Sequence, residues 1–499
     1  MRQAQSGQVK FARHIALLFF ILIFGFFLRS QEALSHNAVF LKDQGRDLLD
    51  VRSIVVDKKL SLIGPYTGLQ GVFQGPLYYY LLSIPFALFK GDPTGVLYLF
   101  VGASMAAILI GYAIGRRLFS PSAGLLIACM YAVSPAAAAA SSFIWSPFLL
   151  IPAASAYLYF FLLWVRFGYL KYYLGMWICL GLLFHFEIAF AAPFTLATIV
   201  IIAMIARKKH YTVSYIYPAC CLFLSLSPLI LFDFRHDHLT IRSLIHLFSG
   251  ATQGLAASHE PFGKIVVDHM VTFVSNVNAS FVSEHSWQGY VSFGMAFFAL
   301  AYIVFGKLPE VKVLLVYPLI LFMIYVLYPF QLWGWYVIGL FPIYFVLMGV
   351  LLDKLKTSAI GNILTIVVLG FIFYNASSRL TKLYAQPDDG GTAKIRGKVA
   401  AIDALYQDAQ GKPFSAFVFT PVVLTDAYDY LFWWHGQRTY GYVPANKKEG
   451  VFYLLIEPDP SKPWSYNGWL ETVIKIGDIL YTKTLPSGFI IQKRYAKTS

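Results

Sequence analysis

The sequence predicts a polytopic α-helical membrane protein with about 11–13 transmembrane helices, followed by a C-terminal extracytoplasmic α/β domain. The chain of 499 residues is 58% hydrophobic and only 13% charged, whereas a soluble protein carries about 25% charged residues. Apolar runs of roughly 18–20 residues recur along most of the chain, and each is long enough to cross a bilayer as a helix. After residue 375 the pattern changes to short alternating segments that are typical of strands.

Eleven apolar runs are the expected transmembrane helices. They cover residues 11–28, 96–115, 122–140, 146–165, 171–187, 189–206, 213–232, 288–306, 311–328, 335–352 and 358–375. No clear small-residue cleavage site follows the first run, which favours a membrane anchor over a signal peptide. The segment Gly75–Phe89 is apolar but short and contains Pro85. We expect it to form a helix at the outer interface, where its tyrosines fit.

The charges on the short connections predict the orientation. If the runs alternate in direction, Arg116 and Arg117, Arg207–Lys209 and Lys354 all fall on the same side as the N-terminus. The opposite short connections, near 141, 187 and 331, contain no Lys or Arg. The positive-inside rule then places the N-terminus in the cytoplasm. The net charge of +14 is explained by these loops, so the expected partner is the lipid bilayer and not nucleic acid.

Three regions are expected on the outer face: a first loop over 29–95, a second large loop over 233–287 and the region 376–499. We therefore divide the chain into a transmembrane domain, 1–375, and a soluble α/β domain, 376–499. Strand-like segments in the second domain read SAFVFTPVV, GVFYLLIE and GFIIQKRY.

Metal and disulfide chemistry is not favoured by the residue pattern. All four cysteines lie in apolar runs, which argues against a disulfide framework or a zinc site. The segment DFRHDH contains His236, Asp237 and His238, but neighbouring residues on a helix point in different directions and supply too few ligands. We expect no required cofactor, and a divalent metal ion stays possible.

Charged residues concentrate directly after the first apolar run, in FLKDQGRDLLDVRSIV at 40–55. Leu41, Leu48, Val51 and Val55 recur at helical spacing, which predicts an amphipathic helix at the membrane boundary. Its acids and its arginine then share one face, because Asp43, Arg46, Asp47 and Asp50 are three and four residues apart. A carboxylate takes a proton from an attacking hydroxyl, and an arginine holds a phosphate with its planar fork. Two alternatives without a catalytic role are that these charged residues lie in a solvated loop, or that they belong to a purely structural helix on the membrane surface.

The segments FLKDQGRD and GVFQGPLYYYLL resemble the first outer loop of the type C glycosyltransferases of family 39. This group includes protein O-mannosyltransferases and lipid A aminoarabinose transferases. The segments YAVSP, IWSPFLLIP and LFDFRHDH are similar to segments of the same family, and YLFWWHGQRTYGYVP resembles the outer domain of its prokaryotic branch. The resemblance implies the type C glycosyltransferase fold and transfer of a sugar from a polyprenyl-phosphate donor to an extracytoplasmic acceptor, in the cytoplasmic membrane of a prokaryote.

The resemblance also implies roles for individual residues. Asp43 matches the catalytic acid position, as base toward the acceptor hydroxyl, and Arg46 matches an arginine near the donor phosphate. Many relatives carry a charged residue in the segment occupied here by Phe73–Pro76, which is uncharged. Arg235 and Arg242 are therefore further candidates for the phosphate, and Arg235 is preferred. Residues expected to contact substrate are Asp47, Gln74, Tyr78, His185, Glu187, Asp233 and His236.

Several of these residues have structural alternatives. Asp47 either orients Arg46 or binds the acceptor, and Glu187 either joins the site or lies in a turn and meets headgroups. Asp233 and Arg235 are expected to close the top of a helix and line the donor cavity.

Two other functions stay open: a transporter or flippase for lipid-linked glycans, and a scaffold for glycan assembly. Transporters place functional charges near the midplane and often contain inverted repeats. This sequence has its charges at the outer surface and shows no repeat, which favours the enzyme. The sequence does not name the sugar or the acceptor.

Overall fold

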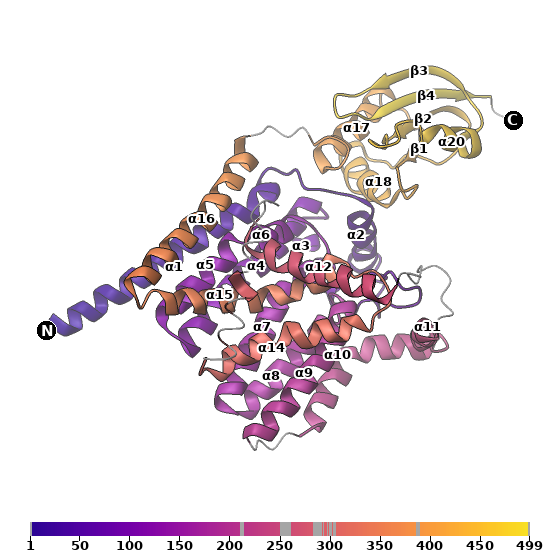
Figure 1. Ribbon diagram of the computed structural model, residues 1–499. Coiled ribbons are helices and arrows are strands. Elements are labelled where there is room, and N and C mark those ends of the chain that lie inside the picture. Colours follow the sequence, from indigo (N-terminus) through magenta and orange to yellow (C-terminus); the bar gives the residue numbers. More distant parts are fainter. Residues whose placement is uncertain are drawn as a thin grey trace.

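The protein is a helical bundle joined to a small sheet domain (Figure 1). The computed structural model describes residues 2–209, 214–249, 261–282, 306–385 and 390–497, together with residues 292, 294–296, 298 and 302. Within these ranges, 8 helices are long and apolar enough to cross a membrane, or up to 9 if a bent pair counts as one span. The predicted polytopic helical fold is confirmed.

The long helices follow the predicted runs closely. They are α1 (Arg2–Leu34), α4 (Pro93–Leu118), α7 (Leu150–Phe167), α9 (Ile188–Lys209), α10 (Ile216–Arg235), α14 (Pro309–Val326), α15 (Phe341–Leu355) and α16 (Ala359–Ala385). Helix α8 (Leu170–Leu183) is shorter than the run predicted over 171–187. Short 3-10 turns, η2 (Ser146–Leu149) and η3 (Gly334–Leu340), precede α7 and α15.

Two expectations about the spans need correction. The run 122–140 is not one straight helix, because α5 (Pro121–Val133) and α6 (Pro135–Ala139) meet at an angle of 57°. Pro135 lacks the amide hydrogen that would continue α5, and Ser134 caps the new helix by accepting from Ala137. The region 233–287 is also more than a loop, since it contains α11 (Leu239–Phe248) and α12 (Phe262–Phe281). The run predicted over 288–306 falls largely outside the described residues.

Several connections that carry Lys or Arg lie together in the structure. Arg166 Nη1 binds Glu310 Oε1 at 3.0 Å, which joins the end of α7 to the start of α14. Ser120 donates to Asp353 at 2.8 Å, which joins the start of α5 to the end of α15. Arg117 Nη2 also donates to the Tyr172 hydroxyl at 2.8 Å, which joins the end of α4 to the start of α8. These four connections therefore lie at one end of the bundle.

The segment between α1 and α4 forms a compact cap of two helices and a folded loop. Helix α2 (Lys42–Val55) coincides with the predicted amphipathic helix, and Leu48 and Val51 are fully buried. Helix α3 (Leu77–Leu88) coincides with the predicted short helix. Two of its three tyrosines, Tyr78 and Tyr79, are buried against α2 and do not lie in an interfacial belt as expected.

The C-terminal region folds around a four-stranded sheet. The strands are β1 (Ser415–Phe419), β2 (Gly450–Ile456), β3 (Asp478–Thr484) and β4 (Ile490–Ala496), in the order β1-β2-β4-β3. The β1–β2 pair is parallel and the other two pairs are antiparallel. Helices α17 (Ile395–Asp408), α18 (Asp426–Leu431) and α20 (Tyr466–Trp469) accompany the sheet, and α18 faces the helical bundle (Figure 1).

Candidate active site

The charged face of α2 carries the candidate site. Arg46 donates from Nε and Nη2 to Asp47 Oδ1, at 2.9 and 2.7 Å, and from Nη1 to Asp43 Oδ1 at 3.1 Å. These contacts use three of the five N–H groups of the guanidinium. Helical spacing places Arg46 and Asp47 on the face of Asp43, since they lie three and four positions after it. One arginine therefore links two carboxylates and retains two further donors.

The two carboxylates lie in different surroundings. The Asp43 side chain is 42% exposed, whereas the Asp47 side chain is fully buried. Tyr78 donates to Asp47 Oδ2 at 3.1 Å, and Tyr79 donates to Asp47 Oδ1 at 3.4 Å. Asp43 is thus open to an incoming molecule, while Asp47 holds Arg46 from behind.

The electrostatics follow from this burial. Burial raises the pKa of Asp47 to about 6, although the charge of Arg46 acts in the opposite direction. Burial lowers the pKa of Arg46, but the carboxylates of Asp47 and Asp43 outweigh it, so that this pKa lies above its ordinary value. Arg46 therefore stays a cation and offers a fixed positive charge beside Asp43.

Tyr66 completes this face and was not expected from the sequence. Its ring lies 4.4 Å from the Arg46 guanidinium carbon and 5.2 Å from Lys42 Nζ. Two cations on one aromatic ring are stabilised by the negative face of the ring. No motif marks Tyr66, and only the fold of the loop over 64–75 brings it to α2.

A second cluster ties this loop to the turn between α8 and α9. Gln74 donates to Glu187 Oε1 at 3.1 Å and accepts from the Ile188 amide at 2.7 Å. Both side chains are buried, and burial raises the pKa of Glu187 to about 7. Glu187 does lie in a turn, but it faces protein and not headgroups.

His185 belongs to the same cluster. Its Nδ1 accepts from the Leu77 amide at 3.3 Å, which leaves Nε2 to donate to the Ser225 carbonyl at 3.0 Å. Both ring nitrogens therefore bind backbone groups, and the side chain is buried. This geometry supports a structural role for His185.

The residues of DFRHDH lie next to the loop but do not converge on Asp43. The Asp233 carboxylate accepts from the Thr240 amide at 2.6 Å, and Thr240 in turn donates to the Gly71 carbonyl at 3.1 Å. Asp233 therefore joins the end of α10 to the first turn of α11. Arg235 and His236 are exposed, and within the described ranges Arg235 has no ion pair. Among those residues, no three His, Cys, Asp or Glu side chains are grouped to hold a metal ion.

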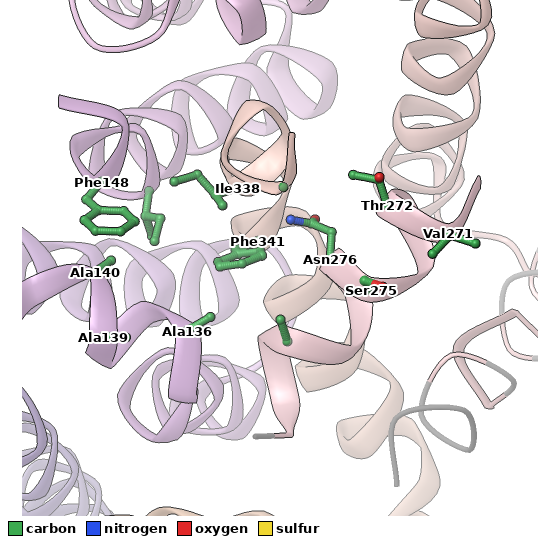
Figure 2. Close-up of a pocket in the computed structure, with 13 residues that line it drawn as sticks. Ala136, Ala139, Ala140, Phe148, Val271, Thr272, Ser275, Asn276, Ile338 and Phe341 are labelled. Carbon is green, nitrogen blue, oxygen red and sulfur yellow. The ribbon is translucent and has the colours of Figure 1, made fainter. Parts of the chain in front are cut away.

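A separate cavity of about 490 Å³ opens inside the bundle (Figure 2). Small and apolar side chains dominate its lining, together with a few polar ones: Ala136, Ala139, Ala140, Phe148, Ile151, Val271, Thr272, Ser275, Asn276, Ala279, Gly334, Ile338 and Phe341. None of these groups is an acid or a base. The cavity therefore suits an apolar ligand part and not the chemical step.

Comparison with known proteins identifies the fold of the chain. Residues 74–232 match the family model of dolichyl-phosphate-mannose-protein mannosyltransferases. The crystal structure of ArnT from Cupriavidus metallidurans bound to undecaprenyl phosphate has a TM-score of 0.61, at 12% identity over 98% of both chains. The apo structure of the same protein has a TM-score of 0.63, also at 12% identity over 98% of both chains. The chain has the fold of the type C glycosyltransferases.

This fold confirms the resemblance stated from the sequence. A more distant similarity is to the archaeal oligosaccharyltransferase AglB from Archaeoglobus fulgidus, in complex with an inhibitory peptide and a dolichol-phosphate. It has a TM-score of 0.51 at 14% identity, over 98% of this chain and 75% of that one. No curated protein matched the chain.

Proposed function

We propose that this protein is an integral membrane glycosyltransferase that moves a sugar from a polyprenyl-phosphate donor to an acceptor outside the cytoplasm. The observation that carries the proposal is the half-exposed carboxylate of Asp43 beside the Arg46 cation. The family-model match over residues 74–232 supports the enzyme class. The lipid phosphates in the similar structures of ArnT and AglB support the donor class.

The proposed step is a single displacement with inversion at the anomeric carbon. Asp43 removes the proton of the acceptor hydroxyl as its oxygen forms the new glycosidic bond. The bond between the anomeric carbon and the phosphate oxygen breaks, and its electron pair leaves with the polyprenyl phosphate. Arg46 offsets the charge that develops on this phosphate through its two remaining N–H groups. Asp47 holds the guanidinium in place, and Tyr78 acts through Asp47.

The donor chain needs an apolar surface, and the cavity in Figure 2 offers one. The short segment between α6 and α7 links this cavity to α2, because Ala140 and Phe148 line the cavity and the Ile144 carbonyl accepts from Gln44 at 3.0 Å. We place part of the polyprenyl chain against this lining. Neither the sugar nor the acceptor follows from these contacts.

The membrane orientation is also part of the proposal. The positively charged end of the bundle faces the cytoplasm of a prokaryote, together with the N-terminus. The cap formed by α2 and α3 and the sheet domain then face outward. The donor phosphate would meet Arg46 at the outer boundary of the membrane.

The proposal is tested with purified protein in nanodiscs and a panel of radiolabelled polyprenyl-phosphate sugars. Release of polyprenyl phosphate with one donor, and its loss in Asp43→Asn, is the expected result. Binding of a donor with no turnover, in the presence of cell-envelope acceptor extracts, would instead favour a transporter or a scaffold.

A further inference from the structure

The sheet domain touches α2 at the residue between the proposed catalytic groups. Helix α18 packs directly on α2 (Figure 1). A Cβ atom at Gly45 would overlap the backbone of Asp426 and Ala427, at only 2.5 Å from Ala427 Cα. The two backbones approach this closely because residue 45 has no side chain.

Helical propensity does not explain a glycine at this position. Gly45 lies in the interior of α2, where glycine is less favourable than alanine because it loses more backbone freedom on folding. It stands two residues after Asp43 and immediately before Arg46. Close packing against α18 is the structural reason for this glycine.

Helix α18 is itself firmly held by a buried network. Lys398 Nζ lies 2.9 Å from the Tyr428 hydroxyl and 2.7 Å from Glu457 Oε2, and the Tyr428 hydroxyl also donates to Glu457. These three side chains come from α17, α18 and the residue that follows β2. The network therefore fixes α18 to the body of the sheet domain.

Further contacts hold both α2 and α18 to the helical bundle. On the side of the bundle, Gln44 donates to the Ile144 carbonyl, and the Asp47 carboxylate binds Tyr78. On the side of the sheet domain, the Tyr430 hydroxyl donates to the Gly91 carbonyl, and its ring lies 5.8 Å from that of Phe40. Displacement of α18 would thus shift the segment that carries Asp43 and Arg46.

We propose that the sheet domain sets the position of Asp43 and Arg46 through the contact of Gly45 with the backbone of Asp426 and Ala427. Gly45 is then a positioning residue. This inference rests on the proposed function only for the part that concerns rate. The contact itself is tested without catalysis.

The experiment compares Gly45→Ala with the wild type and with Gly468→Ala in the full-length protein in nanodiscs. Gly468 is the matched control because it also lies in a helix of the chain, and a Cβ there meets nothing within 4 Å. The first readout is amide hydrogen exchange of the peptide covering 42–55. The second is kcat and the donor KM for release of polyprenyl phosphate.

In Gly45→Ala we expect amide exchange in α2 to be about tenfold faster, since the helix loses its support. We expect kcat per folded molecule to fall about 100-fold, because small displacements of reacting groups are costly. The donor KM should change less than kcat, since attraction between Arg46 and a phosphate depends less steeply on position. A general loss of stability would not separate kcat from KM in this way. Gly468→Ala should match the wild type in both readouts.

Unchanged exchange and unchanged kcat in Gly45→Ala would overturn the inference. If Gly45→Ala does not fold, the inference is tested with Tyr430→Phe, which removes only the hydrogen bond between α18 and the Gly91 carbonyl. Faster amide exchange in α2 of this variant supports the inference. Unchanged amide exchange contradicts it. If the wild type releases no polyprenyl phosphate with any donor and acceptor, the proposed function fails. The exchange measurement still tests the contact in that case.

Discussion

Arg46 donates two hydrogen bonds to a single carboxylate oxygen of Asp47, at 2.9 and 2.7 Å. Asp47 has no exposed surface in its side chain, so this pair is fixed from inside the protein. A third donor of Arg46 holds the same positive group against Asp43. The buried carboxylate of Asp47 thereby fixes Arg46, and Arg46 in turn fixes the carboxylate of Asp43.

Replacement of Asp47 by asparagine is expected to reduce activity and to leave stability at pH 7 unchanged or higher. The amide oxygen in Asp47→Asn can still accept from the Arg46 cation, but the attraction between opposite charges is lost, which weakens the hold on Arg46 by roughly 1.5–3 kcal/mol. We therefore expect turnover to fall about 10- to 100-fold, by the same free-energy difference. Asp57→Asn is the control, because Asp57 forms a partly exposed pair with Arg52 at 3.5 Å. A lower melting temperature with normal turnover would contradict this role.

The stability of the protein should depend on pH through Asp47. Its pKa is about 6 in the folded protein, above the ordinary value of 3.8. Between these values the folded state binds more protons than the unfolded chain, so the free energy of unfolding falls as the pH rises from about 4 to 6. The contribution is about 3 kcal/mol and is constant above this window. The melting temperatures of wild type and Asp47→Asn, measured from pH 4 to 7, should converge or cross as the pH rises. A difference in melting temperature that does not change with pH would contradict the raised pKa of Asp47.

The hydrogen bond between Gln74 and Glu187 should stabilise the folded protein, and the negative charge of Glu187 should not be required for this. Gln74→Leu leaves Glu187 and the Ile188 amide without their buried partner, which costs about 1–3 kcal/mol. Glu187→Gln keeps an acceptor for both the Gln74 amide and the Ala189 amide. Thermal unfolding should therefore show a clear loss for Gln74→Leu and little change for Glu187→Gln. Equal losses would mean that the charge of Glu187 is required.

The orientation is tested by labelling with a membrane-impermeant maleimide in a cysteine-free variant. Ser461 is exposed in the sheet domain, and Thr357 is exposed between α15 and α16. Ser461→Cys should react in intact cells, whereas Thr357→Cys should react only after permeabilisation. The reverse pattern would place the sheet domain in the cytoplasm and contradict the proposed site of transfer.

Much of the fold could be predicted because its signals are local. Runs of apolar residues define the long helices, and the spacing of Asp43, Arg46 and Asp47 is enough to place them on one face. The break at Ser134 is visible as a proline inside an apolar run, but membrane helices also tolerate proline, so the run alone predicts one helix. Strand β3, with the sequence DILYTKT, is missed because most of its residues are exposed and its hydrophobic signal is weak.

The parts that could not be predicted depend on contacts between distant segments. Tyr66 contacts Arg46 only because its loop folds back onto α2. Tyr78 is buried in a hydrogen bond to Asp47, which joins α3 to α2. Gly45 did carry a signal, since a glycine inside an amphipathic helix indicates a close approach. Its partner, α18, lies far away in the sequence and no local pattern points to it.

The central claim is that Asp43 removes the proton of the acceptor. The most direct measurement is release of polyprenyl phosphate from a labelled donor by wild type, Asp43→Asn and Asp57→Asn in nanodiscs, with acceptor extract present. Because Asp43 is 42% exposed, its replacement should leave the fold intact. The account predicts a loss of about 10²- to 10⁴-fold for Asp43→Asn alone. Transfer at the wild-type rate by folded Asp43→Asn protein would contradict it.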